Sequence, residues 1–391
     1  MVALGIDQLL DPYRHLIDHK RIGLISNYPM TDSQLVPVID RLQGHPDTTL
    51  VRLFGPEHGV LNAAREGEHV PFAEDLHTRL PAISLYGDLK APTPDMLEDL
   101  DALVIDLQDI GTRYYTNAST LYYAVEAADT ANIPLIVLDR PNPLGGQIRE
   151  GRILDSAYRS FVGMLPVPVR HGLTFGEEAR LIQALYFPDA EVKVVPMSGW
   201  KRSMLWPETG LPFVPPSPNT TNFAMTLLYP GTCLFEGTNV SVGRGTPHPF
   251  EWIGAPWADG HTLADWFNQQ HLPGVVARPV YFTPARSLYT GDLVSGAQVH
   301  VTDPGAVQAL KTGVMMLLAF LTLYPEKFAI ATPEDTEKRR FFDLLAGGTA
   351  LKEAILARDT ASYFEQAQQE VRQFHQDVQP YLIYPPEEAS E

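Results

Sequence analysis

Three short segments in the first half of the sequence combine carboxylates with histidine, arginine, amide and tyrosine side chains. They are Gly55–Gly59 (GPEHG), Asp106–Asn117 (DLQDIGTRYYTN) and Asp139–Gly146 (DRPNPLGG). Carboxyl groups beside neutral hydrogen-bond donors and aromatic rings suit carbohydrate chemistry, because hydrolysis of a glycosidic bond needs a proton donor and often a second carboxylate. These segments therefore contain the first candidates for an active site.

A second group of polar residues comes later in the chain. Its members are Arg170, His171, Asn219, Glu236, Asn239 and Arg244. Arg244 lies between two glycines, an arrangement that suits the binding of an anionic ligand. The same Gly-Arg-Gly sequence is also common in ordinary tight turns, so this motif alone is weak.

Several candidates in the first group also have a structural interpretation. Glu57 and His58 could cap a helix or form a surface pair, but their place between two glycines at a strand's end favours a functional role. Asp106 or Asp109 could cap a helix N-terminus. At most one of these two aspartates is expected to be catalytic.

Asp139 and Arg140 could equally form a structural ion pair. Tyr114 and Tyr115 could both be core aromatics. Adjacent residues of an extended segment point to opposite sides, so we expect one tyrosine to pack in the core and the other to face a cleft.

Metal-assisted hydrolysis is an alternative chemistry for the same residues. Asp106, Asp109, His58 and His171 could supply oxygen and nitrogen ligands, but no spacing typical of a metal site links them. The sequence also lacks a Gly-x-Gly-x-x-Gly after the first predicted strand, a P-loop and a Gly-x-Ser-x-Gly. We therefore expect neither a metal nor a cofactor.

Short apolar runs alternate with helical patterns over the first 200 residues. Strands are predicted at 21–27, 50–55, 102–107, 134–138 and 192–196, and helices near 32–42, 119–131 and 174–186. A further short helix is expected to begin at Thr93-Pro94. Continuous apolar strands indicate burial on both faces, as in a parallel sheet. A total of about six strand candidates, these five included, is too few for an eight-stranded barrel, so we predict a Rossmann-like, doubly wound, mostly parallel α/β sheet.

The carboxyl ends of parallel strands meet at one edge of a sheet, where ligands bind in such folds. Glu57, Asp106 and Asp139 each follow a different predicted strand. The fold therefore brings carboxylates from three strands to one edge, which is the strongest indication of a site in the sequence.

The pattern changes after residue 200. Residues 200–256 are rich in proline, glycine, asparagine and threonine and predict long ordered loops. Helices near 263–271, 306–323 and 334–374 and strands near 275–282 and 297–302 then predict a smaller α+β domain. We place one domain at 1–250 and the other at 251–391.

Composition limits the partners and the compartment. The 391 residues include 29 basic and 47 acidic side chains, a net charge of −18, which disfavours binding to nucleic acid or to anionic lipid. The single cysteine, Cys233, excludes an intrachain disulfide. No membrane span and no signal peptide is recognised, which predicts a cytoplasmic protein, or an exported one if a leader has been removed. The oligomeric state is left open.

Six motifs, in this order and spacing, resemble one protein family, the NamZ-type exo-β-N-acetylmuramidases, formerly a family of unknown function. They are Pro56–Gly59, Asp106–Gly111, Asp139–Pro143, Arg170–Thr174, Pro216–Asn219 and Glu236–Ser241. The resemblance extends from Gly5 to Tyr384. It implies a Rossmann-like domain without nucleotide, a smaller C-terminal domain and an active-site cleft between them.

The resemblance also implies an activity, the release of N-acetylmuramic acid from the non-reducing end of peptidoglycan fragments, as in cell-wall recycling. Glu57 matches the catalytic acid of the family's Pro-Glu-His-Gly motif. His58 would orient it, and Asp109, or less favourably Asp106, would be a second carboxyl. Arg140, Arg170 and Arg244 are candidate partners of the lactyl carboxylate of the substrate.

An acetamido pocket could be lined by Tyr114 or Tyr115 together with Asn142. The remaining expected substrate-binding residues are Asp106, Arg113, Asp139, His171, Asn219, Glu236 and Asn239. Two rival functions stay open: a metal-assisted hydrolase of amino sugars, and a non-catalytic protein that binds muropeptides.

Overall fold

Seven strands from the first half of the chain form one sheet in the order β3-β4-β2-β1-β5-β6-β7. All neighbouring strands are parallel except β3 and β4, which are antiparallel. The strands are β1 (Arg21–Ile25), β2 (Thr49–Gly55), β3 (Ala73–Glu74), β4 (Pro81–Ser84), β5 (Ala102–Ile105), β6 (Leu135–Leu138) and β7 (Val192–Val195). The predicted mostly parallel α/β sheet is confirmed in this computed structural model, which describes residues 1–65, 67–68, 72–330 and 341–385.

The chain builds this sheet outward from its centre in two directions. From β1 it proceeds to β2 and β4 on one side, and it then crosses to β5, β6 and β7 on the other. Ile25 at the end of β1 pairs with Phe54 of β2 and with Ile105 of β5, so the three strands end at nearly the same level. The order of strands reverses between β1 and β5, which is where open α/β sheets bind their ligands.

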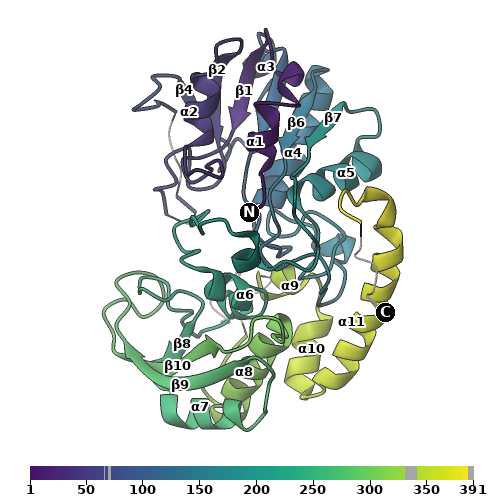
Figure 1. Cartoon of the computed structure of the whole chain (residues 1–391). Coiled ribbons are helices and arrows are strands. Elements are labelled where there is room, and N and C mark those ends of the chain that lie inside the picture. The colour runs from purple at the N-terminus through teal and green to yellow at the C-terminus, as the bar shows by residue number, and fades with distance from the viewer. Residues whose placement is uncertain (66, 69–71, 331–340, 386–391) are drawn as a thin grey trace.

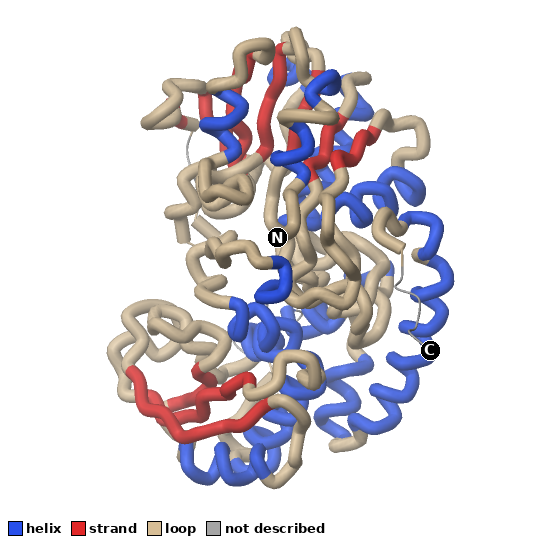
Figure 2. The backbone as a smooth tube through the Cα atoms, in the orientation of Figure 1, coloured by secondary structure: helices blue, strands red, loops and turns tan. Residues whose placement is uncertain are grey.

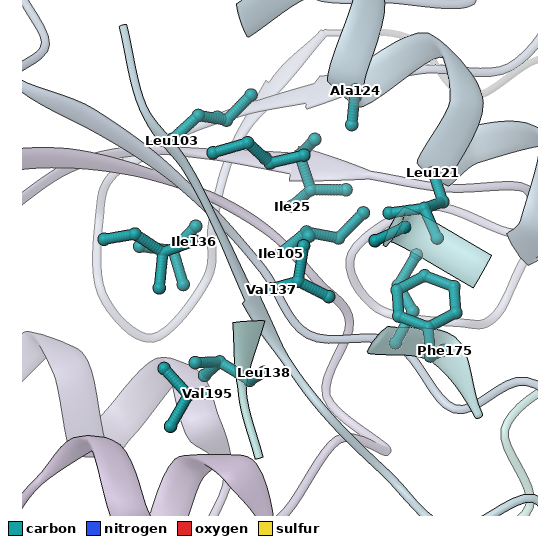
Figure 3. Close-up of a cluster of buried hydrophobic side chains, with 14 of the residues drawn as sticks. Ile25, Leu103, Ile105, Leu121, Ala124, Ile136, Val137, Leu138, Phe175 and Val195 are labelled. Atoms are coloured by element: carbon teal, nitrogen blue, oxygen red, sulfur yellow. The ribbon is translucent and has the colours of Figure 1, made fainter. Parts of the chain in front are cut away.

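Helices cover both faces of the sheet. They are α1 (Gly5–Leu9), α2 (Val38–Gln43), α3 (Pro94–Leu97), α4 (Asn117–Ala131) and α5 (Phe175–Tyr186). Figure 3 shows the core between strands and helices, where Ile105 and Val137 of the sheet lie near Leu121 of α4 and Phe175 of α5. All residues of β5 and β6 are buried, which explains their continuous apolar sequences.

Some local elements differ from those predicted. The helix expected from residue 32 begins only at Val38, because the Asp32 carboxylate accepts hydrogen bonds from the backbone N–H groups of Gln34 and Val36 and forms a turn there. Pro37 then precedes the helix. The segment after β2, in which no strand was predicted, contains the short strands β3 and β4.

The second unit is built on a three-stranded antiparallel sheet in the order β8-β10-β9. Its elements up to residue 323 are α6 (Phe223–Thr232), β8 (Trp252–Ala255), α7 (Gly260–Asn268), β9 (Val275–Phe282), β10 (Val294–Val301) and α8 (Ala309–Leu323). Helix α6 lies in a segment expected to be loops and packs closely against α8. A Cβ on Gly231 would lie only 2.3 Å from the carbonyl oxygen of Ala309, so this crossing requires glycine.

Three helices occupy most of the segment predicted as one helix from 334 to 374. They are α9 (Phe341–Ala346), α10 (Ala350–Ala357) and α11 (Thr360–Asp377), and residues 334–340 lie outside the described residues. Positive φ angles at Gly347, Gly348 and Arg358 end the first two helices. Short 3-10 turns complete the described structure at Arg14–Leu16, Ser156–Tyr158, Trp206–Thr209, Cys233–Gly237 and Gln379–Tyr381.

The C-terminal part of the chain returns to the first unit. Helix α11, yellow in Figure 1, runs along one side of the molecule toward α5. Beyond it, the Tyr384 hydroxyl donates a hydrogen bond of 2.7 Å to Asp139 at the end of β6. Helix α6 packs in the hydrophobic core of the second unit, to which its residue Met225 belongs. The division of the chain near residue 250 remains a prediction.

The region between the two sheets consists mainly of loops, as Figure 2 shows. These loops include the segments that follow β2, β5 and β6, which hold the candidate residues. None of the helices among the described residues has both the length and the apolar character needed to cross a bilayer.

Candidate active site

A pocket lies at the carboxyl ends of β1, β2 and β5, where the two units meet. The space between its walls is about 540 Å³, with its open mouth included. Its lining residues are Asn27, Glu57, His58, Tyr114, Tyr115, Thr116, Asn117, Pro216, Ser217, Asn219, Thr220, Tyr229, Arg244 and Phe250. The pocket therefore lies where the strand order of the sheet reverses, and residues of the second unit form part of its wall.

Glu57 is half-buried in the wall of this pocket, two residues after the end of β2. The Thr116 hydroxyl donates a hydrogen bond of 2.9 Å to its Oε2. The Tyr86 hydroxyl also hydrogen-bonds Glu57, and its pKa is raised by burial and by the charge of that carboxylate. Two neighbouring segments thus fix the orientation of the Glu57 carboxyl.

His58 occupies the tight turn that follows Glu57. Its backbone has a φ of 73° and that of Gly59 is also 73°, so two consecutive residues are left-handed. Gly55 allows the turn to fold back, since a Cβ there would lie 2.4 Å from the backbone nitrogen of Val60. The ring Nδ1 donates to the carbonyl of Ala64 at 2.9 Å, which leaves Nε2 as the second hydrogen-bonding atom of the ring.

Aromatic side chains form another part of the wall. Both Tyr114 and Tyr115 line the pocket and both are largely buried. The Tyr114 hydroxyl donates to the carbonyl of Pro230 in α6. Tyr115 hydrogen-bonds the hydroxyls of Ser217 and Thr220, and burial raises its pKa. The expected division into one core tyrosine and one cleft tyrosine is therefore not seen, because both side chains are packed and both line the pocket. The charge of Glu57 also raises the pKa of the Tyr115 hydroxyl.

Arg244 is the arginine that lines this pocket. Gly243 and Gly245 on either side have positive φ angles of 72° and 79°, so the Gly-Arg-Gly sequence does form a tight turn. The guanidinium lies 5.0 Å from the centre of the Phe250 ring, and its Nε is 2.5 Å from Oε1 of Glu236. A cation held in this way can bind an anionic group of a ligand.

Asn219 also lines the pocket. Its Oδ1 accepts a hydrogen bond of 2.7 Å from Nη2 of Arg286, a residue of the loop between β9 and β10. This contact joins the loop over residues 216–220 to the second unit. Of the predicted residues, the structure thus brings together Glu57, His58, Tyr114, Tyr115, Asn219 and Arg244, with Glu236 directly behind Arg244.

Asp106 and Arg140 do not line the pocket, because they form a buried ion pair with each other. Arg140 Nη2 donates to Asp106 Oδ2 at 3.0 Å and to the carbonyl of Thr31 at 2.9 Å. Burial raises the pKa of Asp106, while the Arg140 charge opposes that rise. Their role in this structure is to fix the ends of β1, β5 and β6.

We expect Arg140→Met to lower the free energy of unfolding by roughly 3–5 kcal/mol, because it leaves the Asp106 carboxylate buried without its partner. Urea unfolding of the purified variant measures this change. The double variant Asp106→Asn, Arg140→Met is the control and should recover part of the loss. A variant with unchanged stability but lost substrate binding would place Arg140 in the site instead.

Asp139 is also buried, and its hydrogen bonds are made within the protein. It accepts from the backbone of Gly176 at 2.7 Å and from the hydroxyls of Thr174 and Tyr384 at 2.8 and 2.7 Å. Burial raises the pKa of Asp139 to about 7, although these hydrogen bonds oppose the shift. Asp139 therefore anchors the C-terminal segment to the sheet.

Four other predicted residues bind protein atoms outside this pocket. Arg113 donates to three backbone carbonyls, including that of Leu345, and burial lowers its pKa to about 10. The Asn142 side chain hydrogen-bonds the backbone of residues 144 and 173. The Asn239 side chain hydrogen-bonds the backbone of residues 327 and 329. Arg170 pairs with Glu150 at 3.0 Å and lines a second pocket at the domain interface.

Asp109 and His171 lie together with Glu178, and all three are buried. His171 Nε2 is 3.4 Å from Asp109 Oδ2 and 3.6 Å from Glu178 Oε1. The backbone N–H of Leu173 donates to His171 Nδ1 at 3.2 Å, so the ring proton must be on Nε2. A protonated nitrogen cannot bind a metal, so this set of side chains fits a metal ion poorly.

Several residues of the pocket were not predicted from the sequence. Asn27 follows β1, and its Oδ1 has no hydrogen-bond partner in the described parts of the chain. The position of Asn27 at the end of the central strand was a signal that could have identified it. Tyr229 and Phe250, whose rings lie 4.8 Å apart, come from apolar stretches with no such signal.

Comparison with known protein families gives matches over almost the whole chain. The model described as exo-beta-N-acetylmuramidase NamZ, N-terminal, matches residues 22–224, and the corresponding C-terminal model matches residues 227–384. The peptidoglycan beta-N-acetylmuramidase NamZ of Bacillus subtilis (strain 168) is 44% identical over 387 residues, which cover 98% of this chain and 91% of that protein.

Solved structures show the same fold. A DUF1343 family protein from Bacteroides fragilis NCTC 9343 matches with a TM-score of 0.89 and 35% identity, covering 98% of this chain and 99% of the other. A second DUF1343 family protein from the same organism matches with a TM-score of 0.76 and 27% identity, covering 99% and 100% of the two chains.

Proposed function

The chain belongs to the NamZ family of exo-beta-N-acetylmuramidases, and we propose that it is a glycoside hydrolase that releases N-acetylmuramic acid from the non-reducing end of peptidoglycan fragments. The observation that carries this proposal is the position of Glu57. Among the residues described as lining the pocket, it is the one carboxylic acid, and its neighbours fix its orientation. Such a group can protonate the oxygen of a departing sugar.

Arg244 supports a muramyl substrate in particular. N-acetylmuramic acid differs from N-acetylglucosamine by a lactyl group that carries a carboxylate. Of the three arginines expected to bind it, Arg140 pairs with buried Asp106 and Arg170 with partly buried Glu150, both outside the pocket. Arg244 lines the pocket with Glu57. We therefore assign the lactyl carboxylate to Arg244, which can bind it through a charge-assisted hydrogen bond.

The site supports a mechanism with one protein carboxyl. Asp109, the expected second carboxyl, accepts from the Gly111 backbone at 2.5 Å and faces His171, and it does not line the pocket. Some glycosidases use the acetamido group of the substrate as the nucleophile in place of a second carboxylate. We propose that mechanism here, because every N-acetylmuramic acid residue carries such a group.

In this mechanism Glu57 gives its proton to the glycosidic oxygen while the bond from that oxygen to C1 breaks. The acetamido oxygen of the same sugar bonds to C1 and forms a cyclic oxazolinium ion. Water then attacks C1, the ring of the oxazolinium opens, and Glu57 takes a proton from that water. Tyr114, Tyr115 and Asn27 lie where they can contact the sugar and its acetamido group.

The function is tested with two synthetic β-glycosides that carry the same chromogenic leaving group, one muramyl and one N-acetylglucosaminyl. We expect release from the muramyl compound and much slower release from the other, because only the first has a carboxylate for Arg244. Activity that survives a chelator would separate this enzyme from a metal-assisted hydrolase. Tight binding of the muramyl compound without any release would instead indicate a binding protein.

A further inference from the structure

Glu178 is a buried acid that the proposed mechanism does not use. It lies in the first turns of α5 with no exposed surface, and neither of its carboxyl oxygens has a hydrogen-bond partner among the described residues. Oδ1 of Asp109 is also buried and without a partner there. Ligand atoms of Asp109, His171 and Glu178 all lie within 4.8 Å of one another. Two carboxyl groups thus lie close together in the protein interior.

Two ionised carboxylates so close together in a buried space are unfavourable, and one of them must keep a proton. His171 does not compensate their charge, because Leu173 donates to its Nδ1 and the neutral ring then carries its proton on Nε2. The other charges facing Glu178 are the acids Asp139 and Glu177, and Glu177 is already paired with Arg202. Burial, followed by the charge of Asp109, raises the pKa of Glu178 well above its usual value.

Asp109 connects this buried group with the pocket. Its Oδ2 fixes the turn at Gly111, whose φ is 77° and where a Cβ would lie 2.3 Å from Oδ1 of Asn142. The same segment continues through Tyr115 to Thr116, which hydrogen-bonds Glu57. The charge of Asp109 also acts on the Tyr115 hydroxyl. A change in the ionisation of Asp109 or Glu178 should therefore affect Tyr115 and Thr116, two residues of the active site.

We propose that Glu178 is a positioning residue that holds one proton, stays uncharged beside Asp109 and so keeps the segment from Asp109 to Thr116 in its active conformation. At high pH this proton is lost, the two carboxylates repel each other, and the segment no longer holds Tyr115 and Thr116 around Glu57. The proposal rests on the proposed function only for its activity measurement, because its stability measurement needs no substrate.

The test compares Glu178→Gln with the unmodified protein over about pH 5 to 10. Glutamine has nearly the same shape and cannot ionise. We expect kcat/KM of the variant on the muramyl glycoside to be close to that of the unmodified protein near pH 6. At the alkaline end it should be at least about tenfold higher than that of the unmodified protein. Glu365→Gln, an exposed change on α11, is the matched control.

Unfolding in urea at several pH values gives the second measurement. The pKa of Glu178 is raised in the folded protein, so between its unfolded and folded pKa values the folded state keeps a proton that the unfolded state has lost. Raising the pH through that window should increase the unfolding equilibrium constant by up to about tenfold per pH unit. Glu178→Gln should remove this contribution, whereas Glu365→Gln should not.

Three outcomes would overturn the proposal. One is the same pH dependence of stability in the Glu178→Gln variant and the unmodified protein. Another is a divalent metal that purifies with the unmodified protein in stoichiometric amount and is lost from the variant, since it would make these residues ligands. The third is an unchanged pH profile of activity in both Glu178→Gln and Glu178→Met. Absence of activity in the unmodified protein would reject the proposed function alone, and the stability measurement would still decide the role of Glu178.

Discussion

Replacing Glu57 by glutamine is expected to lower kcat on muramyl substrates by roughly 10²–10⁴-fold, the usual contribution of a general acid–base residue. The amide keeps the size of the side chain and can still bond Thr116, so folding and substrate binding should be nearly unchanged. Steady-state kinetics with a muramyl disaccharide measures the loss. KM should change little, because the lost interaction is made mainly in the transition state.

A substrate with a better leaving group refines this test. An activated aryl glycoside needs little protonation, so its cleavage should be affected less by Glu57→Gln than that of the disaccharide. Glu98→Gln, an exposed change at the end of α3, serves as the control for loss of one negative charge in the same domain. Glu57→Gln activity within tenfold of the unmodified protein on both substrates would be incompatible with acid catalysis by Glu57.

The second large effect is expected for Arg244→Met. A hydrogen bond to a charged group contributes about 1.5–3 kcal/mol, which corresponds to a loss of roughly 10- to 150-fold in kcat/KM on the muramyl glycoside. The N-acetylglucosaminyl glycoside lacks the lactyl carboxylate, so its slow hydrolysis should change little. The ratio of the two kcat/KM values therefore measures the contribution of Arg244 to selectivity.

Two controls separate selectivity from damage to the site. Arg244→Lys keeps the charge but loses the planar geometry of the guanidinium, and it should retain part of the preference for the muramyl compound. Urea unfolding should show only a small loss of stability, because the pair between Arg244 and Glu236 is partly exposed. Equal losses on both glycosides would assign the lactyl group to another part of the pocket.

The strands and helices of the first unit could be predicted from the sequence because the patterns that indicate them lie within short stretches of the chain. The apolar runs of β5 and β6 are continuous, and all their residues are buried in the sheet. The capping box of Thr174 and Glu177 marks the start of α5, where a helix was predicted. Helix α6 was not predicted, because its sequence contains Pro230 and Gly231 and its stability comes from packing against α8.

The site could be located only to the edge of the sheet. Sequence order shows which strand a residue follows, but it does not show the direction of its side chain. Glu57 and Asp106 both follow strands that end at this edge, yet Glu57 faces the pocket while Asp106 pairs with Arg140 beneath it. The sequence motifs therefore mix residues of the pocket with residues that support its loops.

The contribution of the second unit could not be predicted from spacing. Tyr229 of α6 and the neighbouring Phe250 reach the pocket only because the two units pack against each other. These side chains are apolar or aromatic, and in a sequence they cannot be distinguished from ordinary core residues. The Gly-Arg-Gly turn was a local pattern from this unit, and it does place Arg244 in the pocket.

The most direct test of the central claim is a crystal structure of the Glu57→Gln variant with a muramyl disaccharide bound. The account predicts the muramyl ring between Tyr115 and residue 57, with the side-chain amide of residue 57 next to the glycosidic oxygen and the lactyl carboxylate at Arg244. Density for the sugar in the second interdomain pocket, beside Arg170 and Arg202, would contradict it.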